Sequence, residues 1–209
     1  MDLDEYIEAH IDREPAHLHE LYRHTNLTRL YARMCSGHTQ GRLLAMLSKM
    51  ISPRRVLELG TFTGYSALCL AEGIPAGGEL HTVEIDDESE DELLELFASA
   101  PGGEKITLHI GDALSLIPEL GEEWDLVFID ANKRNYCDYY EAVFPKVCSG
   151  GYIIADNTLW DGKVVDPTAH DAQTEGIMAF NDMIAADDRV EKVILPIRDG
   201  MTIIRKKTY

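Results

Sequence analysis

The sequence lacks the features that mark secreted, membrane-spanning and zinc-ribbon proteins. Its four cysteines show no C-x-x-C pairing and no zinc-ligand spacing, and two of them lie in apolar helical patterns, where we expect buried, reduced thiols. No apolar run approaches the roughly 20 residues that a membrane span needs. The first five residues, MDLDE, are acidic and lack the charged-then-apolar layout of a signal peptide. We therefore expect a cytoplasmic protein.

Positive charge is also scarce. The chain has 19 lysines and arginines against 37 aspartates and glutamates, which gives a formal net charge of −18. Nucleic acid and anionic membranes would repel such a chain, so we expect neither as a partner. The length of 209 residues, 45% of them hydrophobic, suits one domain with a substantial core. We expect a single domain over residues 1–209, with N-terminal helices over 1–52 and a binding core over 53–209.

The strongest local pattern is a strand, a glycine-bearing turn and a helix. Residues 56–59 form a short apolar run, the run breaks at Gly60 and Gly64, and residues 67–71 follow in an apolar helical pattern. Glycine lets a backbone approach a ligand closely, and the start of the helix presents free N–H groups. In α/β sheets a nucleotide-like cofactor is held at such a turn. The alternative interpretation is an ordinary connection between a strand and a helix.

Strands and helices alternate after this turn. Strands are predicted over 79–85, 106–110, 124–130 and 152–156, and helices over 88–100, 113–120, 136–148 and 175–186, with a loop over 164–174. Two last apolar runs, 190–196 and 201–205, flank Asp199-Gly200, which is a strong hairpin signal. Residues 2–50 read as helices only, the third of them beginning at Thr39 or Gln40. This order predicts a parallel sheet with helices on both faces, to which the hairpin adds an antiparallel strand.

Three acidic residues stand where strands of this sheet are predicted to end. Glu84 follows Gly64 by about 20 residues, a position where an acid accepts hydrogen bonds from ribose hydroxyls. Asp112, with Ala113, follows the third strand, where a carboxylate could meet an adenine amino group. Glu58 lies in an apolar strand end, and we expect it to have a partner because an unpaired buried carboxylate is costly. Each acid alone could be a surface residue, but together they indicate a cofactor site.

A second polar cluster follows the fourth and fifth strands. Asp130 ends one strand and Asp156-Asn157 end the other, so the two strand ends lie about 5 Å apart if the strands are neighbours, and three oxygen ligands then converge on one point. Three oxygen ligands of this type suit Mg²⁺, Mn²⁺ or Ca²⁺ rather than zinc. The alternative is that these residues cap the segments that follow, which Asp and Asn do well.

Lys133 could act beside this cluster. It lies three residues after Asp130, and its charged form is disfavoured next to a divalent cation, so it could serve as a base. A second basic side chain, His38 next to Gly37, could line a site. The alternatives are a solvated loop lysine and a solvent-exposed loop histidine.

These stretches together resemble the cation-dependent, S-adenosylmethionine-using O-methyltransferases related to caffeoyl-CoA and catechol O-methyltransferases. The resemblance runs from about Met34 to Lys206 and rests on the motifs ELGTFTGYS (58–66), GDA (111–113), DLVFIDANKRNY (125–136), GGYIIADNTLWDG (150–162) and LPIRDG (195–200). It implies a Rossmann-like methyltransferase fold: α/β, doubly wound, with a mostly parallel seven-stranded sheet, an antiparallel C-terminal hairpin strand and N-terminal helices. It also implies S-adenosyl-L-methionine and a divalent cation (Mg, Mn or Ca) as cofactors, a phenolic small-molecule substrate and a homodimer.

The resemblance assigns roles to individual residues. The expected cofactor-binding residues are Ser36, Glu58, Gly60, Thr61, Ser66, Glu84, Asp112, Ala113 and Asp130. The expected metal ligands are Asp130, Asp156 and Asn157, the expected catalytic residues are Lys133 and Asp130, and Lys133 and Trp160 would contact the substrate. Asn132 stands where the family often has Asp, which should not affect the metal. Residues 36–41 differ from the more acidic version in the plant enzymes, so substrate preference does not carry over.

The implied reaction moves a methyl group from a sulfonium to a phenolic oxygen by in-line displacement. The metal would bind both oxygens of a vicinal diol and fix one of them against the methyl group, while Lys133 accepts or orients the proton. Two other functions are weighed against it. An NAD-dependent oxidoreductase would carry G-x-G-x-x-G, whereas the turn here is Gly60-x-x-x-Gly64. A non-catalytic binding module would have no use for the cluster around Asp130.

Overall fold

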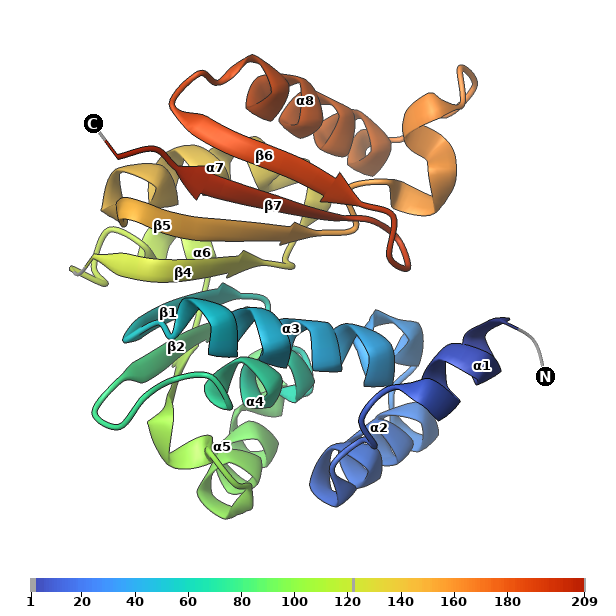
Figure 1. Cartoon of the computed structure of the whole chain (residues 1–209), viewed down its shortest axis with the longest axis vertical. Coiled ribbons are helices and arrows are strands. Elements are labelled where there is room, and N and C mark those ends of the chain that lie inside the picture. The colour runs from blue at the N-terminus through green and yellow to red at the C-terminus, as the bar shows by residue number, and fades with distance from the viewer. Residues whose placement is uncertain (1–2, 122, 209) are drawn as a thin grey trace.

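Seven strands form one sheet in the order β3-β2-β1-β4-β5-β7-β6 (Figure 1). This computed structural model describes residues 3–121 and 123–208, so the first two residues of the acidic start lie outside the described residues. The strands are β1 (Arg55–Leu59), β2 (Glu79–Glu84), β3 (Ile106–Ile110), β4 (Trp124–Ile129), β5 (Val147–Asp156), β6 (Val190–Leu195) and β7 (Met201–Lys206). β1 to β5 pair in parallel, and β7 pairs antiparallel with both β5 and β6. The predicted fold class is confirmed.

Helices cover both faces of this sheet (Figure 1). They are α1 (Leu3–His10), α2 (Ala16–Thr28), α3 (Gly37–Ile51), α4 (Tyr65–Ala71), α5 (Glu90–Ser99), α6 (Ala113–Leu116), α7 (Tyr136–Val143) and α8 (Ala172–Ala186). Short 3₁₀ segments lie between them: η1 (Ala32–Met34), η2 (Asp87–Ser89), η3 (Gly103–Lys105), η4 (Lys133–Asn135), η5 (Phe144–Lys146) and η6 (Trp160–Val165). No helix in the described ranges is both long and apolar enough to cross a membrane.

The central strand β1 shows why these strands read as apolar runs. Leu57 and Leu59 pack into a cluster with side chains of α7 and α8, whereas Val56 packs into a second cluster with side chains of α3, α4 and α5. Since successive side chains of a strand point to opposite faces, a strand covered on both faces is apolar at nearly every position. The exceptions in β1 are Arg55 at its partly buried start and Glu58, which is buried and points to the same face as Val56.

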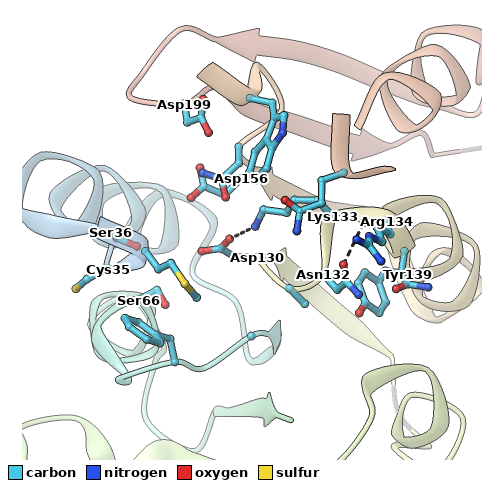
Figure 2. Close-up of a pocket in the computed structure, with 18 of the residues that line it drawn as sticks. Cys35, Ser36, Ser66, Asp130, Asn132, Lys133, Arg134, Tyr139, Asp156 and Asp199 are labelled. Atoms are coloured by element: carbon cyan, nitrogen blue, oxygen red, sulfur yellow. Dashed lines mark hydrogen bonds and ion pairs between the residues drawn. The ribbon is translucent and has the colours of Figure 1, made fainter. Parts of the chain in front are cut away.

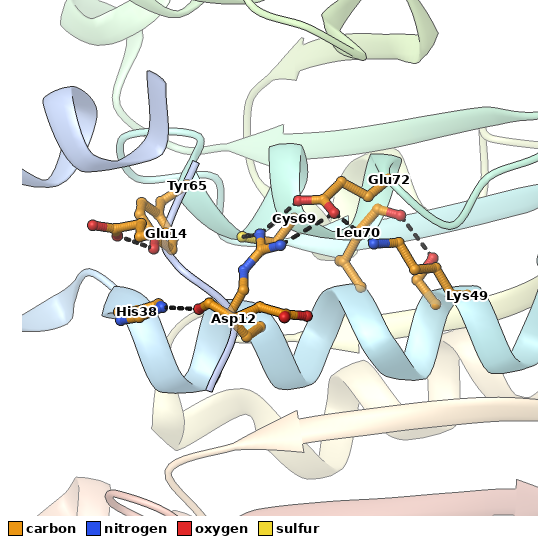
Figure 3. A network of polar contacts seen from close by, with 10 residues as sticks. Asp12, Glu14, His38, Lys49, Tyr65, Cys69, Leu70 and Glu72 are labelled. Carbon is orange, nitrogen blue, oxygen red and sulfur yellow. Dashed lines mark hydrogen bonds and ion pairs between the residues drawn. The ribbon is translucent and has the colours of Figure 1, made fainter. Parts of the chain in front are cut away.

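Polar contacts fix the N-terminal helices to the face of the sheet that Val56 points to (Figure 3). The Tyr65 hydroxyl at the start of α4 donates to Glu14 Oε1, and Arg42 of α3 forms an ion pair with Glu72 at the end of α4. His38 Nε2 lies 2.7 Å from the backbone oxygen of Asp12. These contacts join the segment between α1 and α2 to α3 and α4.

Several predicted boundaries differ from the structure. The helix expected over 136–148 is wrong at its end: α7 stops at Val143, Pro145 follows in η5, and β5 already begins at Val147. The expected loop over 164–174 overlaps η6 and the start of α8, where Asp171 caps the backbone N–H groups of Gln173 and Thr174. α3 begins at Gly37 rather than at Thr39 or Gln40. α6 ends at Leu116 instead of Leu120, shortly before Pro118.

Candidate active site

The strand order reverses between β1 and β4, and a cavity of about 1350 Å³ opens where these strands end. In open α/β sheets such a reversal leaves a crevice at the carboxyl ends of the strands. The turns after β1 and β4 touch there: a Cβ added to Gly60, whose φ is +100°, would lie 2.2 Å from the backbone oxygen of Asp130. Glycine is therefore required at this position both for its conformation and for space.

The β1–α4 turn and Glu84 form one end of the cavity. The N–H groups of Gly60 and Thr61 both donate to the backbone oxygen of Val83, at 3.0 and 3.2 Å, which ties the turn to β2. The Glu84 carboxylate accepts from the backbone N–H groups of Phe62, Ile85 and Asp86 at 2.7 to 3.0 Å. A carboxylate has about four acceptor positions, so about one remains for a ligand hydroxyl.

Glu58 lies behind this end of the cavity and does not line it. It is fully buried, and its Oε2 accepts from the Thr82 hydroxyl at 2.6 Å, so the expected partner is confirmed. Thr61 and Thr82 share a hydroxyl contact of 2.6 Å, and since Thr82 donates to Glu58, Thr61 donates to Thr82. Burial raises the pKa of Glu58 to about 8, although contacts with Ser66 and Thr82 lower it.

The other predicted cofactor residues all line the cavity, and they are Ser36, Gly60, Thr61, Ser66, Glu84, Asp112, Ala113 and Asp130. Asp112 also caps α6: its Oδ2 accepts from the backbone N–H of Ser115 at 3.1 Å and from the Ser115 hydroxyl at 2.9 Å. A capping role and a cavity-lining position thus coexist at Asp112.

The other end of the cavity holds Asp130, Lys133 and Asp156, which Figure 2 shows close together. β4 and β5 are neighbours, as the metal hypothesis required. Lys133 Nζ lies 2.6 Å from Asp130 Oδ1, and Lys133 is only 9% exposed. The pKa of Asp156 is raised, first by burial and then by the Asp130 carboxylate, while a hydrogen bond from Gln40 lowers it.

Asn157 and Trp160 complete this end, as predicted, and both line the cavity. Asn157 adopts a left-handed backbone conformation with a φ of 58° directly after β5. The adjacent Thr158 is held from two sides, by the Thr202 hydroxyl at 2.8 Å and by the Asn181 amide at 2.8 Å. Trp160 Nε1 is buried and has no hydrogen-bond partner in the part of the chain that the structure describes.

The donor set suits a hard divalent cation. Among residues 3–121 and 123–208, no three His, Cys, Asp or Glu side chains converge as a metal-binding group. The set predicted from the sequence has a different make-up, with the carboxylates of Asp130 and Asp156 and the amide of Asn157. After burial, the neighbouring Asp130 carboxylate is what raises the pKa of Asp156, because two carboxylates repel each other when both are charged. A divalent cation would offset this repulsion.

Two site residues were not predicted from the sequence. Gln40 Nε2 donates to Asp156 Oδ2 at 2.7 Å, and Arg198 Nη1 donates to Gln40 Oε1 at 2.8 Å. A signal for Gln40 was present, since it shares a helical face with Leu43, Leu44 and Leu47 yet is polar. His38, in contrast, does not line the cavity and contacts the backbone of Asp12 instead.

Comparisons with known proteins match nearly the whole chain. The family model described as O-methyltransferase matches residues 8–207. Caffeoyl-CoA O-methyltransferase 5 of Nicotiana tabacum is 33% identical over 208 residues, which cover 94% of this chain and 86% of the relative. Caffeoyl-CoA O-methyltransferase 2 of Zea mays is 34% identical over 206 residues, which cover 93% of this chain and 78% of the relative.

Solved structures give the same result. The O-methyltransferase TomG from Streptomyces achromogenes, in complex with SAM, has a TM-score of 0.90 and 27% identity and covers 99% of this chain and 96% of its own. The O-methyltransferase from Bacillus cereus, in complex with SAH, has a TM-score of 0.90 and 29% identity. The match covers 98% of this chain and 97% of that protein.

Proposed function

The chain belongs to the O-methyltransferase family, and on that premise we propose that it methylates one hydroxyl of a catechol-type phenolic small molecule with the help of a divalent cation. Family membership and the SAM- and SAH-bound relatives identify it as an S-adenosylmethionine-dependent O-methyltransferase of the caffeoyl-CoA type. The metal and the vicinal-diol acceptor are the parts that we propose. An NAD-dependent oxidoreductase and a non-catalytic module are not favoured.

One observation carries the proposal: a single cavity joins the two ends of the site. The β1–α4 turn and Glu84 lie at one end, and Asp130, Lys133 and Asp156 lie at the other. A methyl donor bound at the first end and a hydroxyl held at the second would meet without any rearrangement of the sheet. Transfer by in-line displacement needs this proximity more than any other feature.

Asp130, Asp156 and Asn157 would hold the cation. When bound, a divalent cation stabilises the negative charge that develops on the accepting oxygen and aligns the two oxygens of a vicinal diol. The chain's own residues position the acceptor. Trp160 lines the cavity and would form a wall of the acceptor pocket.

Lys133 would handle the proton of the accepting hydroxyl. In the transfer the carbon–sulfur bond of the sulfonium breaks, the carbon–oxygen bond forms, and the hydroxyl proton must leave the oxygen. Lys133 Nζ, which lies 2.6 Å from Asp130 Oδ1, would accept this proton or orient the hydroxyl that carries it.

An acceptor series tests the proposal. With S-adenosylmethionine and Mg²⁺, we expect methylation of catechols, of hydroxycinnamate derivatives with two adjacent hydroxyls and of flavonoids with a catechol ring. The matched compounds with a single hydroxyl should react poorly, because they offer one oxygen to the cation instead of two. Equal rates with one hydroxyl and with two would contradict the vicinal-diol part of the proposal. Calorimetry with S-adenosylmethionine and with NAD separates the oxidoreductase alternative.

The homodimer and the cytoplasmic location belong to the proposal as well. Exposed apolar side chains at the end of α2 and just after it, Leu27, Leu30 and Tyr31, support a second copy as partner. Met34, which follows them, is exposed and also lines the cavity. A dimer formed over this surface would therefore border the cavity.

A further inference from the structure

Gln40 connects the metal end of the cavity to another part of the chain. It lies in the first turn of α3, is 1% exposed, and donates from Nε2 to Asp156 Oδ2, 116 residues away. Its Oε1 accepts from Arg198. Because a guanidinium only donates hydrogen bonds, Arg198 fixes which end of the amide is oxygen, and the nitrogen then faces Asp156.

Arg198 connects Gln40 to the segment that covers the donor end. It lies in the turn between β6 and β7 with a φ of 48°. Its Nη1 also donates to the backbone oxygens of Cys35, at 2.9 Å, and of Ser36, and its Nη2 donates to that of Arg33 at 3.1 Å. Within the described ranges no carboxylate is hydrogen-bonded to this guanidinium, although acidic residues outnumber basic ones almost two to one.

The segment from Arg33 to Ser36 lines the cavity, and Figure 2 shows Ser36 beside Ser66 of the cofactor turn. A ligand at the donor end would contact this segment, and the segment holds Arg198 through three backbone oxygens. A change in the position of the segment would therefore move Arg198 and, through it, Gln40 and Asp156. The chain of contacts is continuous. The contact between Gln40 and Asp156 is buried, and those of Arg198 with Gln40, Cys35 and Ser36 are partly buried, whereas the contact of Arg198 with Arg33 is exposed.

We propose that Gln40 and Arg198 are positioning residues that couple binding of the methyl donor to the placement of the Asp156 carboxylate as a metal ligand. The inference rests on the proposed function, because it takes Asp156 as a ligand of the cation. A coupling of this kind is reciprocal: the donor tightens the cation by the same factor by which the cation tightens the donor.

The test uses Mn²⁺ and S-adenosylhomocysteine as probes on the full chain. Calorimetry gives the Kd of Mn²⁺ with and without S-adenosylhomocysteine, and the ratio of the two values is the coupling factor. In the native protein we expect S-adenosylhomocysteine to tighten Mn²⁺ binding at least fivefold. In Gln40→Met and in Arg198→Met, whose side chains are of similar length, we expect the factor to fall close to one.

Two further variants separate coupling from general damage. Arg205→Ala is the matched control on β7, where Arg205 pairs with the exposed Glu191, and it should keep the full factor. The double variant Gln40→Met with Arg198→Met should lose no more than either single variant, because the two residues act in series. Gln40→Glu keeps the side-chain size and the contact with Arg198, and it should bind S-adenosylhomocysteine normally yet lose the coupling even if Gln40→Met does not fold.

The possible failures are distinct. If the native protein binds no Mn²⁺, the cation part of the proposed function and the coupling fall together. If it binds Mn²⁺ and the Gln40 and Arg198 variants keep the native factor, the coupling is overturned and the proposed function stands. An equal loss of the factor in Arg205→Ala would also overturn it, because the effect would then reflect general destabilisation of the hairpin.

Discussion

Glu58 is a buried acid whose titration opposes folding. Its ordinary pKa is 4.5 and burial raises it to about 8, so its contribution to stability is fully present below pH 4.5 and is lost as the pH rises through about 8. A glutamine side chain at this position is neutral at every pH and resembles the protonated form. We therefore expect the free energy of unfolding of Glu58→Gln, relative to that of the native protein, to increase by roughly 1.4 kcal/mol per pH unit between pH 5 and 8.

Urea unfolding of the cofactor-free protein at several pH values measures this difference. Asp156, whose pKa is also raised, contributes a slope of the same sign, but it is present in both proteins and cancels in the difference. Parallel stability curves for the two proteins would show that Glu58 titrates near its ordinary value.

Lys133 is the residue whose loss should affect chemistry most and binding least. It contacts Asp130 at 2.6 Å at the acceptor end of the cavity. We expect Lys133→Met to lower kcat by about 10²- to 10⁴-fold and to change the Kd of S-adenosylmethionine by less than about threefold. Lys192→Met, on the exposed edge strand β6, is the control and should keep native kinetics. A native kcat in Lys133→Met would remove the lysine from the mechanism.

The helix α8 supports the acceptor end from behind. A Cβ added to Gly176 would lie 2.5 Å from the backbone oxygen of Lys133 and 2.9 Å from the Cα of Arg134. Alanine is the better helix former by about 1 kcal/mol, so propensity alone predicts that Gly176→Ala stabilises the protein. We expect the opposite, a lower Tm together with at least a tenfold lower kcat, because the helix must move away from η4.

Asp182→Ala, an exposed substitution on the same helix, controls for the change in propensity and should leave kcat at the native value. Thermal melting and steady-state kinetics of the two variants decide the matter. A Gly176→Ala protein with a raised Tm and native kcat would mean that α8 does not position Lys133.

Elements with a clear period were predictable, and contacts between distant elements were not. The parallel strands and the hairpin at Asp199-Gly200 follow from apolar runs and turn residues that are local in sequence. The start of β5 at Val147 was not predicted, because Gly150 and Gly151 interrupt the apolar run, although the strand continues through them. The site residues at strand ends were predictable for the same local reason. Gln40 and Arg198 meet across 158 residues, and no local pattern encodes such a pair.

The whole molecule exposes apolar side chains that a single copy leaves uncovered. Leu27, Leu30 and Tyr31 are between 64% and 88% exposed at the end of α2 and just beyond it. We expect light scattering to report twice the mass of one chain, and Leu30→Asp to shift the protein toward one copy, because a charge in an apolar interface is costly. Asp182→Ala should leave the dimer intact. A single-chain mass for the native protein at micromolar concentration would contradict the proposed homodimer.

The role of the cation is tested most directly by methyl transfer to a catechol acceptor in the presence of a chelator. We expect activity to fall at least about 10²-fold in excess EDTA and to return when Mg²⁺ is added beyond the chelator. Asp156→Ala should stay inactive at any Mg²⁺ concentration yet bind S-adenosylhomocysteine, whereas Asp166→Ala, on an exposed loop, should behave as the native protein. Full activity in excess chelator would contradict the metal site at Asp130, Asp156 and Asn157.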